Sequence, residues 1–457
     1  MSKTRGRHLR IAALLIGITL IAAACGSDKK TAAPAAGSSG TASGSSAASA
    51  PKGTPGALAG MKGTTPLVDL PADFKAALDA QGLDLKGVYN YGAESYDAVV
   101  VIALAVDVAN TDGIDYANKI NGVTRGTTKC TSFKDCDALI KAGTKDIHYF
   151  GKSGPLEFSG NGEPTLASYG IQQFGANDKI DDSKTTFKTA KAPASADVPQ
   201  VPVEGTRAGD GVLKIGTLLP ETGSLAFLGP PERAGVRLAI KDINAAGGVL
   251  GKPVQVTEGD SGDTSTDIAS KTVDRELGEG VDAIVGAASS GVTLTVIDKI
   301  VNAGVVMFSP ANTSKKLSTY PDKGLYFRDA PSDILQGQVL GDLIASDGVN
   351  NLAIIDRNDA YGTGLTEDLT KSFTGSGGKV VATVTYDQNA QTFDSEVSQL
   401  KDAGADGIAV IGFAESARIL ALMVQKGIGP ANVKVYGVDG NMGNTLGTDF
   451  EAGTISG

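Results

Sequence analysis

The stretch VDAIVGAASSGVTLTVIDKIVNAGVVMFSPANTS, residues 281–314, decides the fold of this chain. Its apolar run 281–285 predicts a buried strand, the small residues 286–291 a tight loop, and the helical spacing of apolar residues in 292–302 a helix. The run 305–308 predicts a second strand, followed by the polar loop 309–314. Strand, helix and strand at this length form a βαβ unit with parallel strands and a right-handed crossover.

The loops after these two strands form the first candidate site. Because the strands are parallel, their carboxyl ends meet at one edge of the sheet, where open α/β sheets bind ligands. Ser289 and Ser290 stand at the amino end of the expected helix, where free N–H groups and the helix dipole favour an anion such as a carboxylate. The spacing is equally compatible with serines that only cap the helix.

The bulk properties indicate a large, acidic protein with a secretory signal. The chain has 457 residues, 41% of them hydrophobic, which is enough for two or three domains. Its formal net charge of −10 argues against nucleic acid or anionic lipid as the main partner. Residues 1–24 combine a basic start, an apolar run and a final Ala-Ala-Ala, and they predict a signal peptide rather than a membrane span.

The three cysteines suggest two different roles. Cys25 directly follows the small residues 22–24 and resembles the modified cysteine of a bacterial lipoprotein, which implies cleavage before it and a lipid on its sulfur. Ordinary signal cleavage with a free cysteine is the alternative. With Cys25 lipidated, Cys130 and Cys136 are the remaining thiols of an exported protein, so we expect a small disulfide loop there and no metal site.

Two folded blocks follow a tether and are separated by a second linker. Residues 25–56, rich in Ser, Ala, Gly and Pro, predict a flexible tether. The block 57–190 has helical patterns at 71–81, 95–110 and 114–121, of which the second is apolar on nearly every side, and strand-like runs at 154–158 and 168–174. Residues 191–210 contain Pro193, Pro199 and Pro202 and predict a linker that reaches about 60 Å when extended.

The block 211–457 alternates strand and helix in two successive series. Strands are expected at 212–219, 253–258, 281–285 and 305–308, and then at 351–355, 380–386, 407–411 and 433–438. Helices are expected between them, at 232–245, 292–302, 364–373, 393–402 and 415–426. Two such series predict two doubly wound α/β lobes, with a cleft where their loop edges face each other.

Several motifs of this block are specific for one family. They are IGTLLPETGSLAFLGPPERAGVRLAIKDINAAGGVLGKPV at 215–254, GAASSGVT at 286–293, NDAYGTGL at 358–365 and YGVDGNMGN at 436–444. They resemble type I periplasmic binding proteins of the branched-chain amino acid group. In the early block, ESYDAVVVIALA at 94–105 and SGPLEFSGNGEPTLASYGIQQF at 153–174 resemble the C-terminal third of the same family.

The resemblance implies an α/β fold of two doubly wound, Rossmann-like lobes joined by a three-stranded hinge, with the chain in permuted order. The join of the permuted pieces would run from Gly457 to about Met61, and the Pro-rich linker would tie the usual ends together. Lobe 1 would comprise 212–331 and 57–154, and lobe 2 would comprise 332–454 and 155–182. Two incomplete fragments of tandem proteins are the alternative.

The resemblance also implies a ligand site between the lobes. The family holds an amino acid's carboxylate with lobe 1, where Ser290 or Ser289 and the residues Ala311 and Thr313 would bind it. A zwitterion can be desolvated only if both of its charges find hydrogen-bonded partners.

Lobe 2 would supply the partner of the ammonium. Asp439 matches the acid that pairs with it, and Tyr361 would close over the ligand; as alternatives, Asp439 caps a helix and Tyr361 only packs. Phe413 stands where the family often has a hydroxylated ring, which leaves the ligand's identity open. Phe227 or Leu228, after the first strand, is expected near the ligand's side chain, and Tyr91 and Tyr96 are weaker candidates.

The implied function is an extracytoplasmic, lipid-anchored receptor. It would deliver an amino acid or a similar small polar solute to an ABC permease by closure of the cleft, as a monomer and without a metal or cofactor. A ligand sensor for a membrane signalling partner fits the same residues. A hydrolase is disfavoured, because no G-x-S-x-G motif occurs and His148 is the only histidine after the signal peptide.

Overall fold

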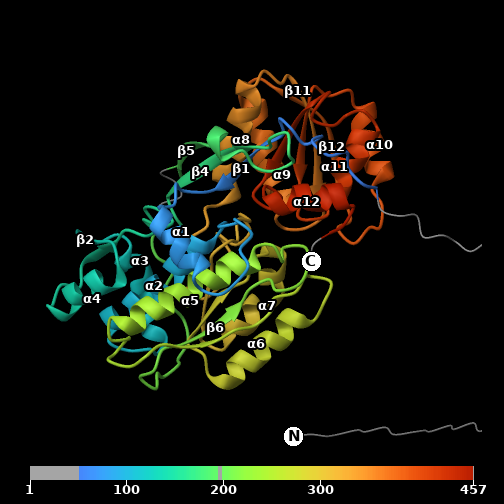
Figure 1. Cartoon of the computed structure of the whole chain (residues 1–457). Helices are drawn as coiled ribbons and strands as arrows, with labels where there is room; N and C mark the ends of the chain where they lie inside the picture. The colour runs from blue at the N-terminus through green and yellow to red at the C-terminus, as the bar shows by residue number, and fades with distance from the viewer. Residues whose placement is uncertain (1–50, 194–197, 456–457) are drawn as a thin grey trace, which may run out of the picture. The chain divides into compact units, whose positions relative to one another are not determined.

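The computed structural model describes residues 51–193 and 198–455, which are built on two main β-sheets (Figure 1). Each sheet is the centre of one lobe. The predicted signal peptide, Cys25 and the tether up to residue 50 lie outside the described residues. None of the described helices combines the length and the apolar content that crossing a membrane requires.

Lobe 1 contains a five-stranded parallel sheet. The βαβ unit predicted at 281–314 is confirmed, because β8 and β9 pair in parallel with Ala283 opposite Val306, and α7 connects them. The strand order is β7-β6-β8-β9-β10, which places a topological switch point between β6 and β8. The strands are β6 (Lys214–Leu218), β7 (Gln255–Thr257), β8 (Ala283–Gly286), β9 (Val306–Ser309) and β10 (Tyr326–Arg328).

The helices of lobe 1 come from both blocks of the chain. Helix α2 is buried on nearly every side, as predicted, and its residues share one hydrophobic core with β6, β8 and β9. It packs so closely on α5 that a Cβ added to Gly235 would lie 2.1 Å from the Gly92 carbonyl oxygen. The helices are α1 (Ala72–Asp79), α2 (Gly92–Ala109), α3 (Ala117–Val123), α4 (Phe133–Lys141), α5 (Gly229–Ala245), α6 (Ile268–Glu279) and α7 (Ser290–Asn302).

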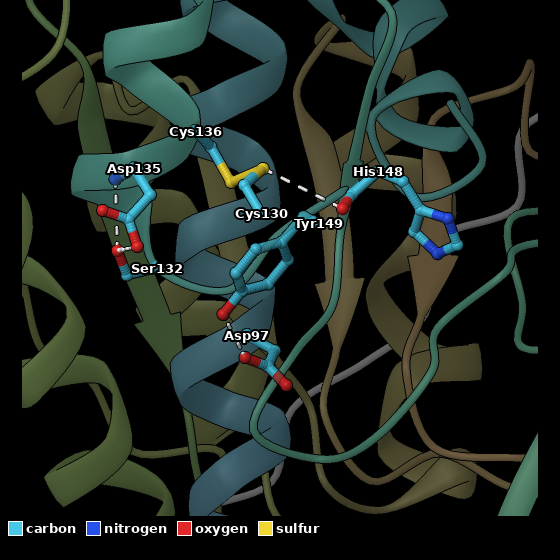
Figure 2. Close-up of a disulfide and its surroundings, with 7 residues drawn as sticks. All are labelled: Asp97, Cys130, Ser132, Asp135, Cys136, His148 and Tyr149. Carbon is cyan, nitrogen blue, oxygen red and sulfur yellow. Dashed lines mark hydrogen bonds between the residues drawn. A yellow bond between two sulfur atoms is a disulfide. The ribbon is translucent and has the colours of Figure 1, made fainter. Parts of the chain in front are cut away.

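A small subdomain of lobe 1 holds the predicted disulfide. Cys130 ends β2 (Thr128–Cys130) and is bonded to Cys136 in α4, with 5.3 Å between their Cα atoms (Figure 2). His148 lies in β3 (Ile147–Tyr149), which pairs in parallel with β2. The neighbouring Tyr149 donates a hydrogen bond of 2.6 Å to the buried Asp97 carboxylate of α2. The disulfide therefore ties α4 to the strand pair that packs on α2.

Reduction of this disulfide should destabilise the protein by about 2 kcal/mol, because it releases a short loop in the unfolded chain. Thermal unfolding with and without a reductant measures the loss. If the melting temperature does not change, thiol labelling of the untreated protein decides whether the bond exists; two free thiols would contradict the assignment.

Lobe 2 contains a seven-stranded sheet with the order β12-β11-β13-β14-β1-β4-β5. Its first five strands are parallel and repeat the order of the lobe 1 sheet, with β1 of the early block in the fifth place. The strands β4 and β5 add an antiparallel extension. The strands are β1 (Lys62–Pro66), β4 (Leu166–Gln173), β5 (Thr186–Lys191), β11 (Asn351–Arg357), β12 (Lys379–Tyr386), β13 (Gly407–Ile411) and β14 (Lys434–Val438).

The place of β1 corrects the predicted lobe boundary. Residues 57–154 were expected in lobe 1, but Lys62 pairs with Tyr436 of lobe 2 on one side and with Gln173 on the other. Its sequence KGTTP has too few apolar residues to predict a buried strand. The helices of lobe 2 are α8 (Asp333–Ser346), α9 (Gly362–Gly375), α10 (Asp394–Asp402), α11 (Ser416–Gln425) and α12 (Asn444–Ala452).

The start and the end of the described chain meet in lobe 2. The Gly53 N–H donates to the Phe450 carbonyl of α12 (2.7 Å), and the Gly56 N–H donates to the Asp178 carboxylate (2.6 Å). The contacts with the folded body thus begin inside the segment 25–56 that was predicted to be a flexible tether.

One predicted strand is absent from the described residues. The run 154–158 is not a strand; only Phe158 forms a single bridge, with Pro164, where the chain passes from lobe 1 to β4. The Pro-rich linker leads from β5 in lobe 2 to β6 in lobe 1, and its described part is bound to lobe 1 by backbone hydrogen bonds. Glu204 donates to the Lys323 carbonyl (3.0 Å), and the Arg207 carbonyl accepts from Ile114 (3.0 Å).

Candidate functional site

Buried side chains lock together the two lobe 1 loops that follow β8 and β9. Asn312 donates from Nδ2 to the carbonyls of Ala287 and Ala288 (2.9 and 2.8 Å). Ser309 Oγ donates to the Ala287 carbonyl (2.7 Å) and accepts from the Ala311 N–H (3.2 Å). These bonds fix the backbone that forms the lobe 1 wall of the cleft.

The two serines of the lobe 1 wall have different roles. Ser289 Oγ accepts from the Val292 N–H (3.4 Å), so Ser289 is the N-cap of α7, which was the structural alternative. Ser290 is buried, lines the cleft, and accepts a hydrogen bond from the Ser314 N–H (3.3 Å). Of the pair, Ser290 is therefore the one placed to meet a ligand.

The Asp439 carboxylate stands at the centre of the lobe 2 wall, directly after β14. Its Oδ1 accepts hydrogen bonds from the Tyr361 hydroxyl (2.7 Å) and from Gln336 Nε2 (2.8 Å). Its Oδ2 accepts from the Tyr91 hydroxyl (2.7 Å), which comes from lobe 1. Only 4% of Asp439 is exposed, so water does not solvate the carboxylate. Neutral hydrogen-bond donors from both lobes stabilise it instead.

Two stacked side chains, Phe413 and Arg357, support the Tyr361 ring. The Tyr361 ring stacks on the Phe413 ring, with 5.3 Å between the two centroids. The Arg357 guanidinium carbon lies 3.6 Å from the Phe413 centroid and forms a cation–π contact with that ring. Arg357 is held in turn by Asp359 (2.6 Å) and Glu415 (2.8 Å). Phe413 therefore acts as the middle layer of a stack that places the Tyr361 hydroxyl over Asp439.

Six of the eight predicted ligand-binding residues line one cavity between the lobes. The space left in it is about 10 Å³, roughly what one water molecule needs. Its apolar residues belong to a hydrophobic cluster that draws on both lobes. The predicted residues are Ser290, Ala311, Thr313, Tyr361, Phe413 and Asp439, and they are joined by Tyr91, Leu225, Leu228, Ala288 and Gly440.

The other predicted residues lie elsewhere. Ser289 caps α7, as described above. Phe227 lines two neighbouring hollows, which it shares with Thr445 of lobe 2, and does not line the central cavity. Tyr96 is buried in lobe 1 and does not line the central cavity; its hydroxyl donates to Asp242 (3.0 Å) and its ring meets Phe74 edge to face.

Burial dominates the electrostatics of the site. It raises the pKa of Asp439, although the hydrogen bonds from Tyr361, Tyr91 and Gln336 lower it. Burial and the nearby charge of Asp439 raise the pKa of Asp333, at the start of α8, well above its ordinary value. The side chains that line the cavity include no Lys, Arg or His. Such a site favours a ligand that brings its own positive charge.

Sequence reasoning missed several residues of the site. Leu225 and Leu228 both lie in the loop after β6. Leu228, the expected alternative to Phe227, lines the cavity, whereas Leu225 was missed. Gln336 gave no sequence signal, because its role depends on how α8 packs against β14. Within the described residues, no group of three or more His, Cys, Asp or Glu is placed to hold a metal ion.

The comparisons with known proteins agree with this architecture. Residues 212–456 match a family model described as periplasmic binding protein. A Leu/Ile/Val-binding protein homolog of Brucella melitensis is 28% identical over 254 residues, which cover 52% of this chain and 66% of the relative. A leucine-, isoleucine-, valine-, threonine- and alanine-binding protein of Pseudomonas aeruginosa is 30% identical over 203 residues, which cover 44% and 54%.

A solved structure of a type 1 periplasmic binding protein from Bordetella pertussis matches 53% of this chain and 66% of its own, with a TM-score of 0.48 and 28% identity. The chain thus spans less than two-thirds of the length of these relatives. The family model, however, covers more than half of the chain, from before β6 to beyond α12. Together with the two doubly wound sheets, this match shows that the chain belongs to the periplasmic binding protein family.

Proposed function

We propose that this protein is an extracytoplasmic receptor that binds an amino acid or a similar small polar solute and delivers it to an ABC import permease. The observation that carries the proposal is Asp439, a carboxylate buried in a cavity between two lobes and surrounded there by neutral donors and apolar side chains. Of the two relatives named above, one is called a Leu/Ile/Val-binding protein homolog and the other a binding protein for leucine, isoleucine, valine, threonine and alanine, and these names support this ligand class.

The two lobes offer complementary partners for a zwitterion. Lobe 1 brings Ser290, Thr313 and the amino end of α7, whose free N–H groups and dipole attract a carboxylate. Lobe 2 brings Asp439 for the ammonium. Leu225 and Leu228 of lobe 1, with other apolar side chains, suit an aliphatic side chain. A ligand that touches both walls stabilises the closed arrangement, so binding shifts the population toward closure.

A ligand screen by thermal shift tests this proposal most broadly. At a concentration 100 times its dissociation constant, a ligand should add about 2.7 kcal/mol of stability. We expect aliphatic amino acids to raise the melting temperature, and the corresponding amines and alcohols without a carboxylate to leave it unchanged. If a broad set of amino acids and small carboxylates gives no shift, the proposed ligand class is wrong.

We propose further that the chain is one binding protein in circularly permuted order. Three features support this. The strand β1 fills the fifth place of the lobe 2 sheet, next to β14; helix α12 stands where the crossover between them would be; and Gly53 contacts Phe450 at the end of that helix. The described part of the linker then carries the chain from β5 to β6, across to the other lobe.

A reordered gene tests the permutation. A chain in which 212–457 is followed directly by 51–190 should fold, unfold in one cooperative transition, and give the same ligand shifts as the natural order. A second chain that lacks 51–67, and with them β1, should not fold, because β14 and β4 would lose their shared neighbour. If the reordered chain fails to fold, the blocks are fragments of two proteins.

The proposal includes attachment to the outer face of the cell membrane. Residues 1–24 would direct export, and a lipid on Cys25 would anchor the protein, as a monomer, beside its permease. The disulfide between Cys130 and Cys136 fits an oxidising compartment. We assign the protein no enzymatic activity.

A further inference from the structure

The hydrogen bond between Tyr91 and Asp439 joins the two lobes at the cleft. Tyr91 precedes α2 of lobe 1, and Asp439 follows β14 of lobe 2. The two oxygen atoms are 2.7 Å apart, and both side chains are almost fully buried, with exposed fractions of 2% and 4%. Two side chains of the protein thus form a hydrogen bond between the lobe 1 wall and the lobe 2 wall of the cleft.

The two oxygens of Asp439 differ in which lobe supplies their donors. Oδ1 is bound by Tyr361, next to α9, and by Gln336 of α8, and both donors belong to lobe 2. Oδ2 is bound by Tyr91 of lobe 1. When the lobes separate, Oδ1 keeps both donors and Oδ2 loses Tyr91. The second oxygen is therefore the one that is open to a donor from outside.

The backbone of lobe 1 fixes the position of Tyr91. Its φ of 59° lies in the left-handed region, which is uncommon for a bulky residue. The next residue, Gly92, contacts α5 so closely that Gly235 has no room for a side chain. The Tyr91 ring is thus held over the cleft by the helix pair α2 and α5, and it does not reach Asp439 through a flexible loop.

We propose that Tyr91 determines ligand specificity by competing for Oδ2 of Asp439, so that a ligand with a protonated amine displaces the Tyr91 hydroxyl while a carboxylic acid without an amine does not. The inference rests on the proposed function of the cavity. An ammonium forms a stronger hydrogen bond with a carboxylate than a neutral hydroxyl does. The closed cavity has room for about one water molecule, so an amino acid enters only when the lobes separate, and this separation also takes the Tyr91 hydroxyl away from Oδ2.

The raised pKa of Asp439 is consistent with this assignment. Three neutral donors lower the pKa of the carboxyl, but burial still outweighs them. An ammonium in place of the Tyr91 hydroxyl supplies the missing positive charge. A carboxylic acid without an amine does not displace Tyr91 from Oδ2, and it forms no hydrogen bond with Asp439.

The first test uses the protein without any ligand. In Tyr91→Phe, the closed arrangement leaves Oδ2 buried without its donor, so the lobes should separate, and small-angle scattering should show a larger radius of gyration than in the natural protein. Tyr96→Phe is the matched control, because Tyr96 lies in α2, five residues after Tyr91, and its hydroxyl bonds to Asp242 within lobe 1. Equal radii for both variants would overturn the proposal, whatever the cavity binds.

The second test measures selectivity with leucine and 4-methylpentanoate, which is leucine without its amine. In the natural protein Tyr91 satisfies Oδ2 when the amine is missing, whereas in Tyr91→Phe nothing does. The ratio of the two affinities should therefore rise in favour of leucine by about tenfold or more in Tyr91→Phe, and stay constant in Tyr96→Phe. A change of both affinities by the same factor would contradict the competition.

Discussion

Replacing Asp439 with asparagine should weaken the binding of an amino acid by about 30-fold or more. The ammonium of the ligand would lose the carboxylate that neutralises it inside a buried cavity, and losing one partner of a buried charge pair costs about 2 kcal/mol or more. The same change should leave the protein without ligand as stable as before, or more stable, because burial disfavours the ionised carboxyl. Titration calorimetry and thermal unfolding measure the two effects.

The opposite signs of these effects separate a role in binding from a role in folding. Asp402→Asn is the matched control, since Asp402 is an exposed acid at the end of α10 in the same lobe. It should alter neither affinity nor stability. A variant Asp439→Asn that binds leucine as tightly as the natural protein would show that the ammonium is held elsewhere.

Replacing Glu232 with glutamine should raise the free energy of unfolding by roughly 3 kcal/mol at pH 9 and change it little at pH 4. Glu232 lies in α5 with no exposed surface, and neither of its carboxyl oxygens has a hydrogen-bond partner among the described residues. Burial raises its pKa well above the ordinary value, and so does the charge of Glu94 in α2. Asp329, also buried, adds a third acid, and its pKa is raised by burial and by these neighbours.

The sign of the pH dependence follows from these raised pKa values. A carboxyl group whose pKa is higher in the folded state stabilises the protein fully below its unfolded pKa, and this contribution is lost as the pH rises through the folded value. For Glu94, whose pKa burial raises to about 8, the loss falls between about pH 4.5 and 8. Glutamine cannot ionise, so Glu232→Gln removes its part of the slope.

Urea unfolding at pH 4, 7 and 9 checks this expectation. Glu204→Gln, a change at an exposed position of the linker, is the control and should have no effect at any of the three pH values. A difference between Glu232→Gln and the natural protein that does not grow with pH would mean that folding does not raise the pKa of the Glu232 carboxyl.

The sequence predicted the elements that carry strong apolar patterns. The βαβ unit at 281–314 and the strand Gly407–Ile411 are where they were expected, because buried parallel strands are continuous apolar runs. Ser290 was found because it follows such a strand, and residues at strand ends gather at one sheet edge. Thr313 and Asp439 also follow strands of this kind, but the family resemblance was what named them.

Other residues depend on contacts that no local pattern encodes. The strand Lys62–Pro66 is polar in sequence and is a strand only because β14 and β4 flank it. Gln336 reaches Asp439 from a helix whose packing decides its direction. Tyr91 comes from the other lobe, 348 positions from Asp439 along the chain, and a weak family resemblance was the only sign of it. Ser289 was a plausible ligand-binding residue from the sequence, but its hydroxyl caps α7 instead.

A crystal structure with the amino acid that gives the largest thermal shift tests the central claim most directly. We expect its carboxylate beside Ser290 and Thr313 of lobe 1 and its ammonium on Asp439 of lobe 2, with β1 paired to β14 in the same molecule. A ligand bound away from this cavity, or an early block folded apart from the lobe 2 sheet, would contradict the account.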